Sequence, residues 1–222
     1  MPPINRVVFL IDGFNVYHSV KSASHDLGLG GSGTRWLNIH SWCRSYFSAM
    51  GALTGNAQIQ IEGIYYFSAL ATHLLAIDAD VIKRHETYIE CLEASGVTVE
   101  LSRFKKKKIQ CPHCSQNVVR REEKETDVAI ASKLLEVFHL NQCDTAMIVT
   151  GDTDIVPAFR TAQRLFPHKH IGFLLPYKRH NKEITLLNPL HFLVPKEAYA
   201  RHQFSDPFVT SAGKPIAKPP SW

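Results

Sequence analysis

Two short apolar segments, far apart in the chain, each end in a turn that carries aspartate. Residues 7–11 run directly into Asp12, and residues 146–150 run into a turn with Asp152 and Asp154. Apolar runs without polar alternation are typical of strands buried on both faces of a parallel sheet. Side chains at the carboxyl ends of such strands converge on one crevice. The two segments therefore predict an open α/β sheet with aspartates gathered at one edge.

Apolar strands alternate with amphipathic helices along most of the chain. Right-handed crossovers between such elements predict a three-layer α/β/α sandwich around a mainly parallel sheet of five or six strands. The strand order 3-2-1-4-5 fits best, and it puts the switch point between the two strands that end in aspartate. The predicted strands are 6–11, 58–67, 97–101, 145–150, 170–175 and a short 191–194, and the predicted helices are 14–22, 38–50, 78–94, 126–139 and 154–166.

The length and composition favour a single core. With 222 residues, 45% of them hydrophobic, the chain is sized for one domain. We predict a domain over residues 1–204, with a small basic insert that contains cysteines at about 104–121. Four prolines after residue 205 predict an unpacked proline-rich tail over 205–222.

Cysteine usage and hydropathy indicate where the protein works. The chain has five cysteines and no secretory leader, which argues against a disulfide framework and predicts a reducing, cytoplasmic location. No apolar run approaches the roughly 20 residues that a membrane-spanning helix needs. The formal net charge of +5 is compatible with an anionic partner without requiring one.

The acidic residues have two readings. Asp12 is followed one helical turn later by Asn15, so both side chains can face the crevice, but aspartate is also a common helix N-cap. Capping accounts for only one of Asp152 and Asp154, and Asp127 lies beside the buried face of its predicted helix. Carboxylates that converge repel one another unless a cation lies between them, and ligands with oxygen alone favour Mg²⁺ or Mn²⁺.

Three motifs together resemble the NYN domain, a branch of the PIN-like ribonuclease superfamily that includes LabA-like bacterial proteins. They are IDGFN at 11–15, KETDVA at 124–129 and VTGDTDIVP at 149–157, and the resemblance covers roughly residues 5–200. Thr150 and Thr153 stand where the family often has serine, which keeps the hydroxyl groups.

The resemblance implies a PIN-like sandwich with a Mg²⁺- or Mn²⁺-dependent phosphodiesterase centre. Asp12, Asp127 and Asp152 would form the acidic core, supported by Asp154 and Asn15. We therefore expect a metal-dependent ribonuclease, specifically an endoribonuclease, that takes RNA as its substrate. The alternative is an RNA-binding or regulatory adaptor that keeps the fold without hydrolysis.

The insert carries two further signals. Cys111 and Cys114 form half of a structural zinc site, which Cys43, Cys91, His113 or the second copy in a homodimer would have to complete; a reduced, unliganded pair is the equal alternative. The basic residues around this pair indicate a surface that follows an RNA backbone, or simply a solvated surface. These basic residues are Lys105, Lys106, Lys107, Lys108, Arg120 and Arg121.

Two other functional interpretations are excluded by the residues or elements around the motifs that suggest them. A haloacid-dehalogenase-like phosphatase needs a second acid two residues after the first aspartate, and Phe14 stands there. The segment 28–33 fits the G-x-G-x-x-G pattern of dinucleotide-binding proteins, but it follows a predicted helix instead of a strand.

Overall fold

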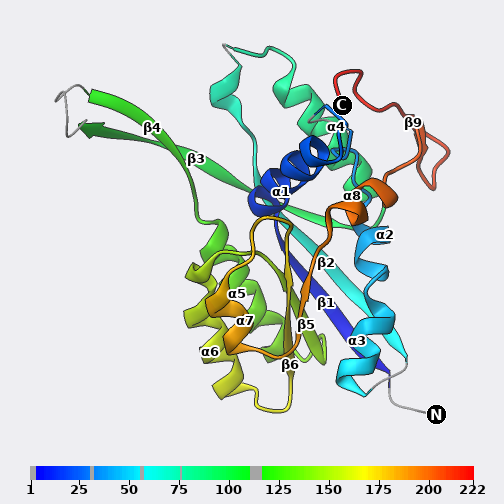
Figure 1. Ribbon diagram of the computed structural model, residues 1–222, viewed down its shortest axis with the longest axis vertical. Coiled ribbons are helices and arrows are strands. Elements are labelled where there is room, and N and C mark those ends of the chain that lie inside the picture. The colour runs from blue at the N-terminus through cyan, green and yellow to red at the C-terminus, as the bar shows by residue number, and fades with distance from the viewer. Residues whose placement is uncertain (1–3, 31–32, 56–57, 76, 111–116) are drawn as a thin grey trace.

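A seven-stranded sheet runs through the molecule with the apolar first strand near its centre (Figure 1). This computed structural model describes residues 4–30, 33–55, 58–75, 77–110 and 117–222, and the backbone alone between 104 and 124. The strand order is β4-β3-β2-β1-β5-β6-β7, and all neighbours are parallel except β3 and β4. The strands are β1 (Asn5–Asp12), β2 (Ile59–Ala69), β3 (Thr98–Gln110), β4 (Asn117–Lys124), β5 (Thr145–Val149), β6 (His170–Leu175) and β7 (His191–Leu193).

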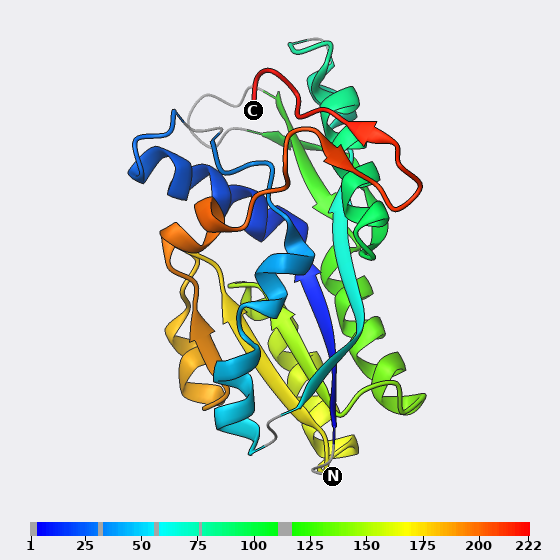
Figure 2. The same cartoon turned by 90° about the vertical axis from the view of Figure 1, so that its right-hand side faces the viewer.

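The predicted three-layer architecture and the strand order of its parallel part are confirmed. Successive side chains of β1 point to opposite faces, so Phe9 joins one core cluster and Leu10 the other. On one face lie α1 (Gly13–Asp26), α2 (Ile39–Arg44), α3 (Phe47–Thr54), α4 (Val81–Ala94) and α8 (Lys196–Arg201); on the other lie α5 (Thr126–His139), α6 (Val156–Leu165) and α7 (Lys182–Leu187) (Figures 1 and 2). Two short 3₁₀ turns are η1 (Thr72–Leu74) and η2 (Thr153–Ile155). In the part of the chain described, no helix is long and apolar enough to cross a membrane.

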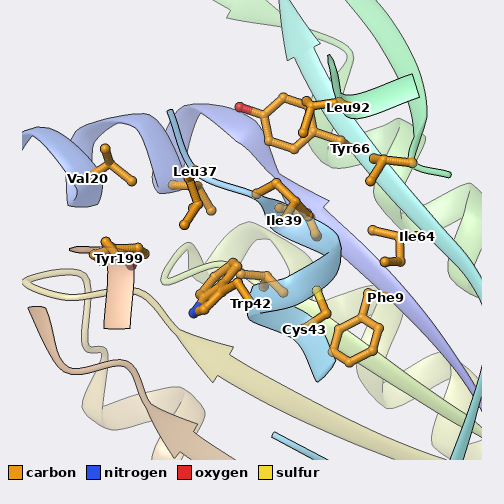
Figure 3. Packing of buried hydrophobic residues seen from close by; sticks show 14 of the residues in the cluster. Phe9, Val20, Leu37, Ile39, Trp42, Cys43, Ile64, Tyr66, Leu92 and Tyr199 are labelled. Atoms are coloured by element: carbon orange, nitrogen blue, oxygen red, sulfur yellow. The ribbon is translucent and has the colours of Figure 1, made fainter. Parts of the chain in front are cut away.

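Aromatic side chains fill the core on the α1 face. Trp42 of α2 is fully buried, and its ring centroid lies 5.6 Å from that of Tyr199 on α8 (Figure 3). Cys43 and Cys91 are enclosed in the same cluster, where burial raises the pKa of both thiols, that of Cys91 to about 12. Completion of a zinc site in the insert by either residue stays a prediction.

The insert is a continuation of the sheet. The predicted third strand ends at residue 101, but β3 continues to Gln110 and pairs with β4 in an antiparallel ribbon, which projects from the body in Figure 1. An antiparallel ladder satisfies backbone hydrogen bonds without an apolar run, and so hydropathy gave no signal for it. The predicted helix 38–50 is also two helices, because the chain breaks after Arg44 and resumes as α3.

The prediction of an unpacked tail is wrong. Residues after 205 form a small hairpin of β8 (Phe208–Val209) and β9 (Pro215–Ile216) that covers the α1-face core. Ile216 is buried, and the ring of Trp222 lies 5.7 Å from that of Tyr88 on α4. The prolines indicated disorder, but a few large apolar residues among them are enough to anchor the segment.

Candidate active site

Asp12 caps helix α1 and also faces the turn after β5. It is the last residue of β1 and the N-cap of α1, where its Oδ1 accepts the backbone N–H of Asn15 at 2.9 Å. Its Oδ2 accepts two further bonds, from the Thr150 hydroxyl at 2.8 Å and from the Asn15 side-chain amide at 2.6 Å. The cap therefore uses one oxygen, and the other ties the end of β1 to the turn after β5.

The two strand ends are joined by a continuous hydrogen-bond network. The Asn15 Oδ1 accepts the N–H of Gly151 at 3.3 Å, and the Thr150 Oγ accepts the N–H of Asp152 at 3.1 Å. Asp152 in turn accepts the N–H of Asp154 at 3.0 Å and so caps η2. Thr150 lies outside the predicted site residues, although its hydroxyl links the two motifs.

Glycine is required in both turns because the backbone of another element passes very close. A Cβ on Gly13 would lie 2.6 Å from the carbonyl oxygen of Phe67 on β2. A Cβ on Gly151 would lie 1.8 Å from the carbonyl oxygen of Arg179, which is far inside contact distance. The turns can therefore bring Asp12 and Asp152 to the same edge only without a side chain at these positions.

Asp127 lies within electrostatic reach of the other three aspartates. Its partial burial in the first turn of α5, and then the charges of Asp12, Asp152 and Asp154, raise its pKa to about 6. The pKa of Asp12 is also raised, mainly by burial and additionally by Asp152, while the hydrogen bonds from Asn15 and Thr150 oppose that shift. The structure thus places all five predicted residues at one edge of the sheet.

The donor chemistry of this edge suits a hard divalent cation. The aspartates supply carboxylate oxygens, the Thr150 hydroxyl lies against the carboxylate of Asp12, and a cation would relieve the repulsion among the aspartates. Across the described residues, however, no three His, Cys, Asp or Glu side chains are already grouped closely enough to hold one ion. Sharing of one ion by Asp12, Asp127, Asp152 and Asp154 therefore stays a prediction.

The raised pKa of Asp127, caused by burial and then by the neighbouring carboxylates, predicts a pH-dependent stability. Its pKa of about 6 in the folded protein exceeds its ordinary value near 4, so the stabilising effect of its proton is complete below about pH 4 and is lost as the pH rises through 6. Asp127→Asn should therefore stabilise the metal-free protein at pH 7.5 by roughly 1 kcal/mol, after allowance for solvent screening, and should change little at pH 4.

Urea unfolding in EDTA at the two pH values measures this difference. Saturating Mn²⁺ should cancel it, because the bound ion stabilises the wild type more than the variant. Equal stability of the two proteins at pH 7.5 in EDTA would show that the folded protein does not raise the pKa of Asp127.

A cleft of about 370 Å³ opens beside the acidic residues. One wall comes from the start of α1 and the turn after β5, and the facing wall comes from the segment 178–181 that follows β6. Sequence analysis missed this basic wall, although the run Lys178-Arg179-His180 follows the end of a strand as the two acidic motifs do. The lining residues are Phe14, Asn15, Gly151, Asp152, Thr153, Lys178, Arg179, His180 and Asn181.

A larger cavity lies at the opposite, amino-terminal edge of the strands. It measures about 860 Å³ and extends from Ile4 to α3 and the start of β2. Its described lining carries no titratable side chain, so it offers no groups for acid–base or metal chemistry.

The basic residues that were predicted to contact RNA lie on the ribbon. Lys105, Lys106, Lys107 and Lys108 belong to β3, Arg120 and Arg121 to β4, and the two backbones are paired. Cys111 and Cys114 lie outside the described residues. Zinc binding by this pair, and a homodimer that would share the zinc ion, stay predictions.

The fold and the acidic edge define the PIN-like class of α/β/α nuclease folds. Residues 6–183 match the model of the NYN domain family, so the chain belongs to the NYN domain family and the resemblance drawn from the three motifs is confirmed. Membership of this family supports the assignment of the chain to the hydrolases, as an enzyme of the nuclease type.

Two known proteins are similar over most of the chain. The 6-hydroxy-3-succinoylpyridine 3-monooxygenase HspA of Pseudomonas putida is 26% identical, over 98% of this chain and 75% of its own. A crystal structure of a protein of unknown function from Vibrio parahaemolyticus superposes with a TM-score of 0.53 at 12% identity, over 86% of this chain and 93% of the other. At that identity the second likeness shows the fold alone.

Proposed function

We propose that this chain is a Mg²⁺- or Mn²⁺-dependent ribonuclease that cuts RNA internally at the acidic edge of the sheet. The observation that carries the proposal is the coupling of four aspartates there: Asp12 is hydrogen-bonded to the turn that holds Asp152, and Asp127 feels the charges of Asp12, Asp152 and Asp154. Membership of the NYN family supports it.

Each residue of the site has a distinct part in this proposal. Asp12, Asp127 and Asp152 would hold the ion, with Asp154 beside them. A bound ion supplies an activated water and neutralises the charge that develops in an in-line phosphodiester displacement. Asn15 and Thr150 donate to Asp12 and so fix the direction in which its carboxylate points. The basic wall opposite attracts the polyanionic substrate.

A cleavage assay on RNAs of mixed sequence tests the proposal. With Mn²⁺ or Mg²⁺ we expect internal cleavage of end-labelled RNA, and EDTA should stop it. Circular RNA separates the two polarities, because only an endonuclease can open it. RNA binding without cleavage under every metal tested would instead identify a non-hydrolytic adaptor.

The name of the Pseudomonas relative points to another activity class, oxygenation of an aromatic ring. Incubation of the same preparation with 6-hydroxy-3-succinoylpyridine and a reduced nicotinamide cofactor in air provides the comparison. Formation of a hydroxylated product by a protein that leaves RNA intact would contradict the ribonuclease proposal.

The basic run in β3 gives a prediction that separates RNA binding from chemistry. Changing Lys105, Lys106, Lys107 and Lys108 together to alanine should raise KM and leave kcat close to normal, because only binding common to substrate and transition state is lost. The log–log salt slope should flatten by up to about 0.7 for each phosphate contact removed. Filter binding at several salt concentrations measures it, and an unchanged KM and slope would reduce the run to a solvated surface.

A further inference from the structure

Phe14 is an exposed aromatic side chain at the edge of the acidic cleft. It lies in the first turn of α1, directly before Asn15, and is 46% exposed. Tyr17, on the same helix, is equally exposed at 46% but does not line the cleft. Single exposed aromatic residues are common on protein surfaces. The reason to expect a function for Phe14 is that it lines the same cleft as Asp152.

Arg179 faces this region from a segment whose backbone is held firmly. Its carbonyl oxygen packs against Gly151, and its N–H donates to Pro176 at 2.8 Å. Tyr177, two residues earlier, makes three hydrogen bonds to the body of the protein. Its carbonyl accepts from the Ser19 hydroxyl at 2.8 Å, and its N–H donates to the Tyr199 hydroxyl at 3.3 Å. Its own hydroxyl donates to the carboxylate of Asp26 at 2.9 Å. The hydroxyls of Ser19 and Tyr199 are themselves hydrogen-bonded at 2.7 Å. Arg179 therefore presents its side chain from a preorganised position.

The charge of Arg179 is available for a ligand, unlike that of its neighbour. Lys178 forms an ion pair with Asp26, and together with Tyr177 and His25 it lowers the pKa of that carboxyl to about 2. Within the part of the chain described, no carboxylate lies within 4 Å of the Arg179 guanidinium.

His18 links the arginine to the aromatic ring. Burial lowers the pKa of His18, and the positive charge of Arg179 lowers it further, so the guanidinium lies within electrostatic reach of the imidazole. The imidazole packs edge-on against Phe14, with the two ring centroids 4.4 Å apart. Phe14 and Arg179 also line the same cleft, together with Asp152.

We propose that Phe14 and Arg179 form a nucleotide subsite, in which an RNA base stacks on the Phe14 ring and the adjoining phosphate pairs with the Arg179 guanidinium. The proposal rests on the proposed ribonuclease function, because it assigns how that site positions its substrate. A base stacked on an aromatic side chain contributes about 1–3 kcal/mol and tolerates any sequence. The planar guanidinium matches a phosphate with two parallel hydrogen bonds, which fixes orientation as well as charge.

Binding of a fluorescent single-stranded 2′-O-methyl oligonucleotide, which resists cleavage, tests the subsite by anisotropy. Phe14→Ala should weaken binding by about 5- to 100-fold, and Phe14→Trp should restore it. Arg179→Ala should weaken binding and reduce the slope of log affinity against log salt concentration by about 0.7. Arg179→Lys should restore binding only in part, because lysine keeps the charge but lacks the two parallel N–H donors of the guanidinium. Tyr17→Ala and Arg164→Ala are the matched controls, since both residues are exposed and neither lines the cleft.

An oligonucleotide with abasic sites separates the two contacts. On it the effect of Phe14→Ala should vanish, because no base is left to stack, whereas the effect of Arg179→Ala should persist. Phe14→Ala that weakens binding no more than Tyr17→Ala, or that weakens abasic and normal strands equally, would overturn the subsite.

The same measurements distinguish failure of the subsite from failure of the ribonuclease proposal. If RNA is cleaved but both variants bind like the wild type, the subsite is wrong and the ribonuclease stands. If the variants lose binding in the expected pattern but no metal supports cleavage, the subsite stands and the ribonuclease is wrong. A wild type that neither binds nor cleaves RNA overturns both.

Discussion

Asp12→Asn should reduce RNA cleavage by at least about 100-fold while the protein stays folded. Metal-assisted stabilisation of a phosphodiester transition state is worth several kcal/mol, and each 1.4 kcal/mol is about tenfold in rate. Asp12 is 4% exposed and both of its oxygens are held by hydrogen bonds, so asparagine fits its volume and removes the charge. Single-turnover cleavage at saturating Mn²⁺ measures the loss.

Stability should change far less than activity. An amide at position 12 would place an NH₂ group opposite Thr150 or Asn15, both of which donate to the carboxylate, at a cost of about 1 kcal/mol. Asp80→Asn makes the same chemical change at an exposed residue outside the cleft and should leave the rate unchanged. A rigorously purified Asp12→Asn protein that cuts RNA at the wild-type rate would place catalysis elsewhere.

Gly151→Ala should damage both stability and cleavage. The added Cβ would overlap the Arg179 carbonyl, so either the turn after β5 or the segment after β6 has to move. Overpacking of this kind costs about 1–3 kcal/mol in free energy of unfolding. A shift of about 1 Å in the neighbouring Asp152 would lower the cleavage rate by about 100-fold. Urea unfolding and single-turnover kinetics report the two effects separately.

Gly63→Ala is the matched control for this substitution. The three atoms nearest to its Cβ would all belong to the Tyr65 side chain, which can turn aside, so stability and cleavage should change much less. Wild-type kinetics in Gly151→Ala would show that the close approach of the two segments does not hold Asp152 in place.

The sequence predicts the middle of the sheet well because buried parallel strands leave an unambiguous signal. β1, β5 and β6 are nearly uninterrupted apolar runs, and their alternation with amphipathic helices leaves few possible strand orders. The aspartates that follow β1 and β5 were predicted to share an edge for the same reason, and the structure brings them together there. Their catalytic role stays a prediction.

Features that depend on long-range contacts were missed. The ribbon of β3 and β4 is held by backbone pairing, which leaves no trace in hydropathy. The tail after residue 205 packs through single residues such as Trp222, whose partner Tyr88 is far away in the chain. The basic wall of the cleft escaped notice because the nearness of Arg179 to Gly151 depends on the path of the backbone.

The hydrogen bonds of Tyr177 show that residues beyond the family match help to build the cleft. Tyr199, which receives the Tyr177 N–H, is fully buried and lies on α8, beyond the stretch 6–183 that matches the family model. Lys196, on the same helix, donates to the carbonyl of Asp26 at 3.1 Å and so braces the residue that pairs with Lys178. A fragment cut at the family boundary would keep Asp12, Asp127, Asp152 and Asp154 but release the cationic wall that faces them. The stretch that defines the family is therefore shorter than the stretch that builds its cleft.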